Sequence, residues 1–399
     1  MRQWSRNGYI MRTHRRIRMR ILFLALDINL DRQRGDTVHA MELANGLASI
    51  GHAITFVVGA ASGHSPTLRS DIVLRVVGGS NRRVVRETLA IAKRSAIDIV
   101  YERRSTPKIG FAVKTRRRIP LVMEINGILR DELHFQGRAD GRTVRGLLKD
   151  RLRGALFRRV DGFIVVSEGI KDDLVARHGV DPRRVLVVGN AVNTTRFQPI
   201  AKQSACRRLE LESERPRAVF VGNLVEWRDF ESLLQATRLL LETVPMFELL
   251  VVGDGPARGS FEARAKALLP ARTVRFAGEV PHTDVPFHIA ASDFGLLPER
   301  VRSLDISPLK LFEYLSCGRP VVAFDVPGLD IVRTLGTGIL VPPGDPGTLA
   351  AAMARLIGSP ELVREMGRTG RAFVERERSW SSVARKTSAY LAEKAARSS

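Results

Sequence analysis

The chain has 399 residues, of which 44% are hydrophobic and 27% charged, a composition typical of globular proteins. This length exceeds what one hydrophobic core usually organises, so two domains are expected. No apolar run approaches the roughly 18 residues that a membrane-spanning helix needs. Cys206 and Cys317 are the only cysteines, too few for a zinc cage or a disulfide framework, which makes the reducing cytoplasm the default location.

The charge is strongly positive, because 64 lysines and arginines stand against 42 acidic residues, a net charge of +22. The first 20 residues hold seven arginines and no acid. They contain neither an apolar central segment nor a small-residue cleavage site, so they do not resemble a secretory signal. We expect a disordered basic arm over residues 1–19, or upstream sequence before a start at Met11 or Met19. A second excess covers residues 101–160, with 16 basic and 6 acidic residues. Such a field attracts polyanions or an anionic membrane face.

Short apolar runs alternate with helical patterns through the first half. Arg20–Asp27 contains a buried first strand, and Thr37–Ile50 has helical spacing that Gly51 ends. Further strands are expected at Ala53–Gly59, Ile97–Glu102, Pro120–Asn126, Asp161–Glu168 and Arg184–Asn190. Strands that alternate with helices predict a parallel sheet with helices on both faces, here a domain of residues 20–198.

The alternation breaks in a polar stretch at Gln198–Pro216, a linker, and then restarts. Strands of the second half are expected at Ala218–Asn223, Glu248–Asp254, Val274–Gly278, Asp293–Pro298 and Pro320–Asp325. Helices at Leu349–Ile357 and Ser382–Lys394 finish the chain. The second domain therefore covers residues 216–378, and residues 379–399 form a helix that can pack back on the first domain. The fold class is α/β, with two doubly wound, Rossmann-like domains that face a central cleft. Ligands of such sheets bind beyond the carboxyl ends of the strands.

The segment 304–329 is the most informative. Ser307 and Pro308 precede LKLFEYL as the cap and first turn of a helix, whose free N–H groups and dipole suit a phosphate. Glu313 lies about two turns further on, where it could accept hydrogen bonds from ribose hydroxyls. The alternative is a well-capped surface helix with a solvated glutamate.

This segment resembles the signature of family-4 glycosyltransferases of the GT-B fold, in which two glutamates are separated by seven residues and followed by a Pro-Val-Val strand. Glu313 matches the second glutamate, and Asp305 stands in place of the first. The resemblance covers about residues 20–392. It implies that backbone amides of the segment Ser307, Pro308, Leu309 and Lys310 hold a donor diphosphate. It also implies that Glu313 holds the ribose and that Asp305 orients hydroxyls of the donor sugar.

Other positions are assigned by the same resemblance. Arg228 falls on a usual lysine of the family and could pair bidentately with a phosphate. Its alternative is a surface arginine beside Trp227. Asn223 replaces a usual arginine at the diphosphate, and backbone around Val280 is expected to pair with the nucleobase.

The amino-terminal half is similar to the family as well. Gly35 would let the backbone approach the donor phosphate or sugar. Asn126 stands where many relatives carry a histidine near the reacting carbon, so Asn126 and Glu124 become hydrogen-bonding candidates for the reacting groups. His39 is expected to be a helix-face residue rather than a catalyst.

The chain contains no Asp-x-Asp pair, the motif with which many other sugar transferases bind a metal on the diphosphate. We therefore expect metal-free stabilisation by Arg228 and helix amides. No cofactor is expected, because the nucleotide-diphosphate sugar is itself the substrate. Similarity to family 4 implies retention of the anomeric configuration. Since no carboxylate nucleophile is evident, the expected reaction is a substrate-assisted displacement on the same face of the sugar.

The acceptor is a glycan, a lipid-linked sugar or a small molecule. Arg142–Val160 is basic and amphipathic, so it could lie on an anionic membrane at the inner face of the cell envelope, although it must also cover a sheet strand. Nucleic acid is not expected as a partner, because no aromatic-rich basic platform is present. Two other function classes stay open: a sugar-nucleotide epimerase of the same architecture, and a noncatalytic partner of another transferase.

Overall fold

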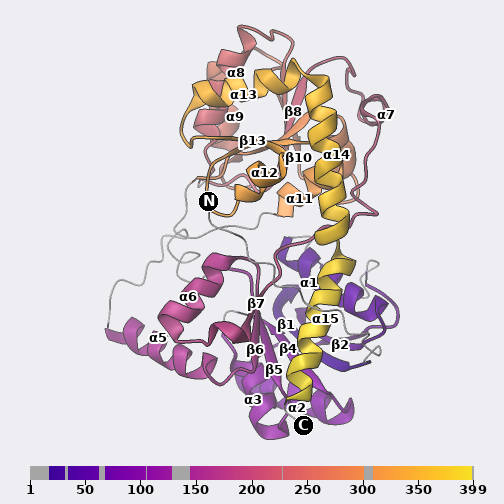
Figure 1. Cartoon of the computed structure of the whole chain (residues 1–399), viewed down its shortest axis with the longest axis vertical. Coiled ribbons are helices and arrows are strands. Elements are labelled where there is room, and N and C mark those ends of the chain that lie inside the picture. The colour runs from indigo at the N-terminus through magenta and orange to yellow at the C-terminus, as the bar shows by residue number, and fades with distance from the viewer. Residues whose placement is uncertain are drawn as a thin grey trace.

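The computed structural model describes residues 18–31, 35–62, 68–104, 106–127, 144–226, 228–300 and 309–397, with backbone alone for 144–150. Figure 1 shows two units, each a twisted sheet between helices. We call them the N-terminal unit, built on strands β1 to β7, and the C-terminal unit, built on β8 to β13. The predicted α/β class with two doubly wound parallel sheets is confirmed. Among the described helices, none combines the length and apolar character needed to cross a bilayer.

The N-terminal sheet is parallel throughout, in the order β3-β2-β1-β4-β5-β6-β7. Its strands are β1 (Arg20–Asn29), β2 (Ala53–Ala60), β3 (Val73–Val76), β4 (Ile99–Arg103), β5 (Leu121–Ile125), β6 (Gly162–Val165) and β7 (Val185–Val187). Strand β3 was not expected from the sequence. It is a short edge strand with largely exposed side chains, so it lacks the buried apolar run that reveals the other strands.

Helices cover both faces of this sheet. They are α1 (Gly35–Ser49), α2 (Asn81–Arg94), α3 (Lys108–Arg117), α5 (Val144–Phe157), α6 (Glu168–His178), the 3-10 turn Pro182–Arg184, and α15 (Trp380–Ala396). Residues of α1 and α15 share one hydrophobic core with β1 and β2, whereas α2, α3, α5 and α6 build the core on the opposite face. The last helix of the chain therefore packs on the N-terminal unit, where Gly46 of α1 allows Ala384 and Trp380 to approach closely.

The C-terminal sheet is also parallel, in the order β10-β9-β8-β11-β12-β13. Its strands are β8 (Arg217–Val221), β9 (Glu248–Val252), β10 (Val274–Gly278), β11 (Phe294–Leu297), β12 (Val321–Phe324) and β13 (Gly338–Val341). Its helices are α7 (Lys202–Arg208), α8 (Phe230–Leu241), α9 (Arg258–Leu268), α10 (Val285–Ala290), α11 (Leu309–Ser316), α12 (Asp330–Leu335), α13 (Pro346–Ile357) and α14 (Pro360–Glu377). Edge strand β13 was missed because its side chains are mostly half-buried. Helix α7 lies inside the segment expected to be a linker.

The chain passes between the units twice. The first crossing is the segment 188–201 between β7 and α7, the second is the segment 378–379 between α14 and α15, and hydrogen bonds join the two. Val192 of the first crossing forms a parallel bridge with Ser379 of the second, and the amide of Val192 donates to the carbonyl of Arg378 over 2.9 Å. Arg371 donates to the carbonyls of Phe197 (2.7 Å) and Ser316 (2.8 Å), which ties the first crossing to α11 and α14. In Figure 1, α14 runs along the C-terminal unit and α15 along the N-terminal unit.

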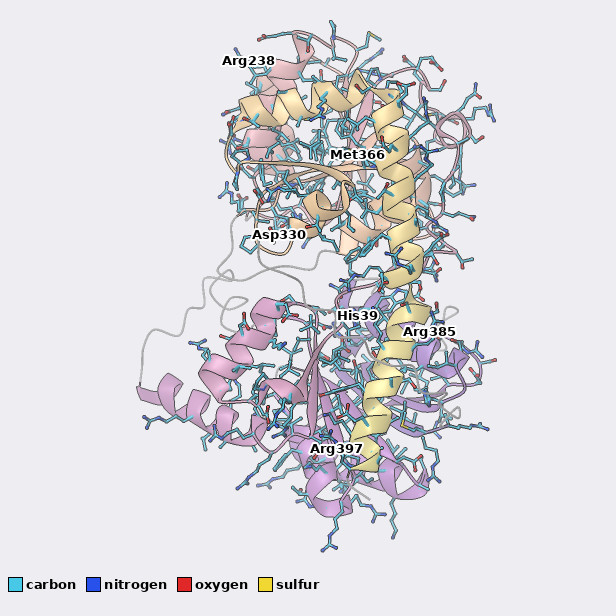
Figure 2. All side chains as sticks on the ribbon, viewed as in Figure 1. His39, Arg238, Asp330, Met366, Arg385 and Arg397 are labelled. Atoms are coloured by element: carbon cyan, nitrogen blue, oxygen red, sulfur yellow. The ribbon has the colours of Figure 1, made fainter. Side chains whose placement is uncertain are left out.

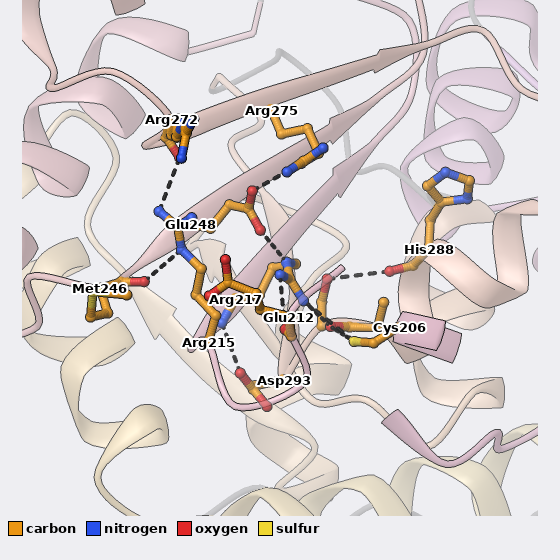
Figure 3. A network of polar contacts seen from close by, with 12 residues as sticks. Cys206, Glu212, Arg215, Arg217, Met246, Glu248, Arg272, Arg275, His288 and Asp293 are labelled. Atoms are coloured by element: carbon orange, nitrogen blue, oxygen red, sulfur yellow. Dashed lines mark hydrogen bonds and ion pairs between the residues drawn. The ribbon is translucent and has the colours of Figure 1, made fainter. Parts of the chain in front are cut away.

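A largely buried ionic cluster lies at the amino-terminal ends of the strands of the C-terminal sheet (Figure 3). Arg217 and Glu248, each 1% exposed, are joined by a 2.6 Å bond, and Arg275 reaches the other oxygen of Glu248 at 3.0 Å. The amide of Arg217 donates to Asp293, which also accepts from Lys202. A buried charge that loses its partner strongly destabilises a protein, so we assign this cluster to the stability of the fold. It lies at the amino-terminal ends of the strands, whereas ligands of such sheets bind at the carboxyl ends.

Candidate functional site

Each sheet has a point where the strand order reverses, between β1 and β4 and between β8 and β11. The loops that leave two such neighbouring strands run in opposite directions, and the space between them is where open α/β sheets bind ligands. In the C-terminal unit the loop after β8 carries Asn223 and Arg228, and Glu299 follows β11. Arg228, which the sequence singled out, therefore lies in a loop at this switch point.

Arg228 is held by three contacts. Its Nη1 is hydrogen-bonded to Glu299, its Nε donates to the carbonyl of Asn223 over 3.1 Å, and its guanidinium lies 5.1 Å from the ring centre of Phe220. Glu299 is buried, and the two residues also form an isolated antiparallel bridge. The side chain of Arg228 is 15% exposed, which distinguishes it from a free surface arginine. Arg228 is thus a fixed cation at the switch point.

The loop after β8 is packed backbone against backbone on the loop after β9. Gly253 has a φ of 130°, and a Cβ there would come within 2.0 Å of the carbonyl oxygen of Gly222. The amide of Leu224 donates to the carbonyl of Asp254 over 2.9 Å. Only glycine at position 253 permits this approach, which fixes the position of Asn223 and Arg228.

Helix α11 is described over Leu309–Ser316 and carries Glu313 on its buried side. Glu313 is 6% exposed, and its Oε2 accepts a 2.7 Å hydrogen bond from Lys310. Burial opposes ionisation, but Lys310 and His282 outweigh it and lower the pKa of Glu313. Glu313 is therefore an ionised, shielded carboxylate rather than a solvated one.

Three predicted residues of this region, Asp305, Ser307 and Pro308, lie outside the described residues. Val280 follows β10 in a loop that contacts α11 through His282, whose Nε2 is 3.5 Å from Oε1 of Glu313. The side chain of Val280 packs partly against the core of the C-terminal unit. The structure thus brings Val280, Leu309, Lys310 and Glu313 to one end of this sheet.

The N-terminal unit contributes Gly35, the first described residue of α1. A Cβ on Gly35 would lie 3.3 Å from Cδ1 of Leu309, so α1 comes close to this side chain of α11 across the two units. Asn126 directly follows β5. Both polar atoms of its amide are shielded from solvent and have no hydrogen-bond partner among the described residues. An amide in this state has its full capacity to donate and accept still available.

Glu124 is placed differently from the expectation that it contacts reacting groups. It is 2% exposed, with Oε1 2.5 Å from Nε2 of His39 and Oε2 accepting a 2.7 Å bond from the hydroxyl of Tyr101. Burial raises its pKa, but His39, Arg103 and Tyr101 outweigh burial and bring the pKa to about 2. Glu124 therefore points into the unit as an ionised partner of His39.

His39 lies on α1, as expected of a helix-face residue, but it is a buried one at 5% exposure. Its Nδ1 lies 3.0 Å from Asn190 of the first crossing, and its ring meets Trp380 edge to face at 4.9 Å. Figure 2 shows His39 at the end of the N-terminal unit nearest the C-terminal unit, far from Arg397. His39 therefore joins the sheet, the crossing segment and α15.

Sequence reasoning missed Glu299 and His282. Glu299 is 71 residues away from Arg228 in sequence, and only the adjacency of β8 and β11 brings the pair together. His282 stands in the same loop as Val280, a proximity that could have drawn attention to it. Within the described part of the chain, no group of three or more His, Cys, Asp or Glu side chains is arranged to hold a metal ion.

Two family models match the chain, one on each unit. The model described as Glycosyltransferase Family 4 matches residues 34–196, and the model described as Glycosyl transferases group 1 matches residues 215–359. Together these segments include most of both sheets.

Curated relatives agree with these matches. The chain is 29% identical over 299 residues to the D-inositol 3-phosphate glycosyltransferase of Streptomyces bingchenggensis, covering 71% of this chain and 64% of that protein. It is 32% identical over 225 residues to the 2-deoxystreptamine glucosyltransferase of Streptomyces kanamyceticus, covering 55% and 57%. The chain thus spans less than two thirds of the length of these two relatives.

Solved structures show the same fold. The sucrose-phosphate synthase from Thermosynechococcus elongatus superposes with a TM-score of 0.73 at 20% identity, over 95% of this chain and 100% of that one. The Anabaena HepE protein, solved in complex with UDP-glucose, gives 0.73 at 19% identity, over 94% and 100%. With a matched segment in each unit and this architecture throughout, the chain belongs to the group 1, family 4 glycosyltransferases of the GT-B fold.

Proposed function

We propose that this protein is a retaining glycosyltransferase that moves a sugar from a nucleoside-diphosphate sugar to a hydroxyl group of an acceptor. The observation that carries the proposal is that the C-terminal sheet has the fixed cation Arg228 at its switch point and the shielded carboxylate of Glu313 on α11, the helix whose Leu309 lies close to Gly35 of the N-terminal unit. Such a place offers a fixed cation to a diphosphate and a shielded carboxylate to a ribose. The solved HepE structures with UDP and UDP-glucose support this class of donor for a protein of the same fold.

Each part of the donor has a proposed partner. Arg228 and the amides around Leu309 and Lys310 hold the diphosphate, and Glu313 accepts hydrogen bonds from the ribose. The main chain at Val280 pairs with the nucleobase, while Gly35 admits the sugar or its phosphate. Asn223 lines the same loop as Arg228, and Asp305 is assigned to the sugar hydroxyls by resemblance alone.

The reaction that suits these residues is a displacement on one face of the sugar. The bond from the anomeric carbon to the diphosphate oxygen breaks, the acceptor oxygen bonds to the same face, and the acceptor proton passes to the leaving diphosphate. Glu124, Glu299 and Glu313 each lie against a basic side chain, which disfavours any of them as a nucleophile. Arg228 and the helix amides stabilise the charge that develops on the diphosphate.

Two residues of the N-terminal unit have different proposed roles. Asn126, whose amide has no hydrogen-bond partner among the residues that the structure describes, is the candidate to hydrogen-bond the reacting groups. Glu124 is turned inward, so we assign it to holding His39 and α1 in place rather than to contact with substrate.

No metal ion or cofactor is assigned to the reaction. We propose instead that the guanidinium of Arg228 balances the charge of the leaving diphosphate, and its fixed position beside Glu299 supports this role. The nucleotide sugar supplies the only small molecule that the chemistry needs besides the acceptor.

The acceptor is proposed to carry negative charge, as a phosphorylated small molecule or a lipid-linked sugar at the inner face of the membrane. Helix α5 supports this, because Leu152 is 58% exposed and follows the exposed Arg151. An apolar side chain among cations is the pattern with which amphipathic helices enter an anionic interface. The residues of this helix before Arg151 have no described side chains.

The decisive experiment is a thermal-shift panel of UDP-, GDP-, ADP- and dTDP-sugars followed by product analysis. A donor that binds only the folded state must raise the unfolding temperature, by an amount that grows with its concentration. Transfer or donor hydrolysis then supports the transferase. Interconversion of donor epimers without transfer would replace it with an epimerase, and binding without any reaction would indicate a noncatalytic partner.

A further inference from the structure

A line of polar contacts runs from the N-terminal unit to the candidate ribose carboxylate. Glu42 of α1 lies 3.5 Å from Arg196 of the first crossing, and Arg196 lies 3.1 Å from Nδ1 of His282. The other ring nitrogen of His282, Nε2, is 3.5 Å from Oε1 of Glu313. The four side chains come from α1, the crossing segment, the loop after β10 and α11, so the line spans both units.

The chemistry of arginine determines which atom donates and which accepts in each hydrogen bond of this line. A guanidinium can only donate hydrogen bonds, so Nδ1 of His282 must accept from Arg196. In the neutral ring the hydrogen is then on Nε2, which faces Oε1 of Glu313 as a donor. Arg196 therefore selects the form of His282 that turns an N–H toward the carboxylate.

The carboxylate of Glu313 is held from two sides. Lys310 binds Oε2 and His282 faces Oε1. The carboxylate of Glu313 therefore cannot rotate without losing one of these contacts. The ring of His282 is itself packed on Phe197, with 5.2 Å between ring centres. This arrangement fixes the carboxylate plane while leaving further lone pairs for hydroxyl donors.

The far end of the line is anchored on the N-terminal unit. Glu42 accepts a 3.1 Å hydrogen bond from Asn193 of the crossing in addition to its pair with Arg196. The side chains of Arg196, Glu42 and His282 are 24%, 12% and 17% exposed, so the contacts are partly shielded from solvent and from salt.

We propose that His282 and Arg196 are positioning residues that orient Glu313 for the ribose of the donor, and that Glu42 connects this orientation to α1. The inference rests on the proposed role of Glu313 in donor binding. A carboxylate held in one plane recognises ribose hydroxyls selectively, because a hydroxyl that is missing leaves its buried partner unsatisfied.

The test measures selectivity for the ribose rather than affinity alone. The probes are UDP, GDP and ADP with their 2′-deoxy and 3′-deoxy forms, and the nucleotide that most raises the unfolding temperature is used. The readout is the ratio of Kd for the deoxy form to Kd for the ribose form. A carboxylate that accepts from a ribose hydroxyl should give a wild-type ratio of about 10 or more, and Glu313→Gln should bring it near 1.

His282→Phe keeps the ring on Phe197 but removes both nitrogens, and Arg196→Met keeps the length of the side chain without its charge. Both variants should lower the ratio toward 1. His282→Gln, which can donate from a similar position, should restore part of it. The matched control is Arg208→Met, because Arg208 also joins an ion pair and lies over an aromatic ring of the same unit, and its ratio should stay at the wild-type value.

A merely structural role would weaken ribose and deoxy forms equally, so a wild-type ratio in His282→Phe overturns the proposal. Glu42→Ala should lower the ratio as well, and an unchanged ratio there overturns the connection to α1. If the wild type itself does not discriminate, the ribose role of Glu313 fails and takes this inference with it. If Glu313→Gln abolishes discrimination while both His282→Phe and Arg196→Met retain it, only the positioning proposal fails.

Discussion

Gly35 of α1 and Leu309 of α11 lie close together although they belong to different units. A Cβ on Gly35 would be 3.3 Å from Cδ1 of Leu309, closer than most such contacts in proteins. The two units therefore approach one another closely at this point, where Leu309 precedes the candidate ribose residue Glu313 on α11.

Enlarging Gly35 tests the importance of this approach. Gly35→Ala should leave the unfolding temperature unchanged or slightly higher, because alanine favours helix by up to about 1 kcal/mol over glycine. Gly35→Val should lower kcat/KM by about tenfold or more, since the larger side chain must displace Leu309. Binding of the nucleotide alone to the C-terminal unit should change little. Gly259→Val on α9 is the control, because a Cβ there meets no other atom within 4 Å. Wild-type kcat/KM in Gly35→Val would contradict this reading.

Arg228 and Glu299 should be separable by kinetics. Arg228→Lys keeps the charge but loses the planar fork, so kcat should fall by roughly 10²–10³ if the guanidinium stabilises the leaving diphosphate. Glu299→Gln removes the negative charge beside Arg228, so the guanidinium of Arg228 is fixed less firmly in its position. Nucleoside diphosphate should then bind equally or more tightly at low salt, while kcat declines. Weaker nucleotide binding in Glu299→Gln, measured by calorimetry, would show that Glu299 does not compete for Arg228.

Two buried carboxyls on neighbouring strands should affect stability with opposite signs. Burial raises the pKa of Glu102 on β4 to about 8, whereas His39, Arg103 and Tyr101 overcome burial and hold the pKa of Glu124 on β5 at about 2. The raised pKa means that Glu102 destabilises the fold increasingly as pH rises from its unfolded value of 4.5 toward 8. The lowered pKa means that Glu124 contributes stability above 4.5, which is lost as pH falls toward 2.

Glu102→Gln should therefore match the wild type near pH 4.5 and be more stable near pH 8, by up to about 4 kcal/mol for a pKa raised from 4.5 to about 8. Glu124→Gln should be less stable at neutral pH and approach the wild type in acid. Urea unfolding of both variants across this pH range measures the difference, followed through the transition of the N-terminal unit. If the difference in unfolding free energy between variant and wild type changed with pH in the same direction for both variants, the assignment of one neutral and one ionised carboxyl would be refuted.

Metal dependence provides an independent check on Arg228. Transfer activity should persist in excess chelator, because the guanidinium and the helix amides supply the positive charge opposite the diphosphate. The assay compares initial rates with chelator, with added Mg²⁺ or Mn²⁺, and with neither. Loss of activity in chelator that either ion restores would show that a cation is required.

Binding to an anionic surface can be assigned to helix α5 or to the basic arm. Vesicles of phosphatidylglycerol and phosphatidylcholine should bind the protein at low salt and release it as salt rises, because exposed charges are screened over about 10 Å at 0.1 M. Each basic residue near such a surface contributes about 1 kcal/mol. The combined change Arg145→Gln, Lys149→Gln and Arg153→Gln should release the protein while donor binding stays unchanged.

Deletion of residues 1–17 is the necessary control, because the arm could bind vesicles by itself. It leaves Met19 in place, which is buried in the core of the N-terminal unit. A protein without the arm that ignores anionic vesicles at low salt would disprove membrane contact through α5.

Local sequence patterns were sufficient for most of the architecture. Central strands such as β1 and β8 are continuous apolar runs, because both of their faces are buried under helices, and this makes them visible in sequence. Edge strands β3 and β13 have one side in solvent, lose that pattern, and were missed. The α/β class follows from the alternation of strands and helices, and the two-unit organisation follows from the chain length and the break in that alternation.

For the site, the sequence determined that Arg228 and Asn126 follow the carboxyl ends of strands and that Glu313 stands on a helix. It could not determine which of them face one another, because the strand order that sets β8 beside β11 is a property of the sheet. Thus Glu299 beside Arg228, the inward turn of Glu124 toward His39, and the line from Glu42 to Glu313 were decided by tertiary structure. Polar partners carry no periodic signal in sequence, and their pairing depends on distances that only the packed sheets and the two crossings establish.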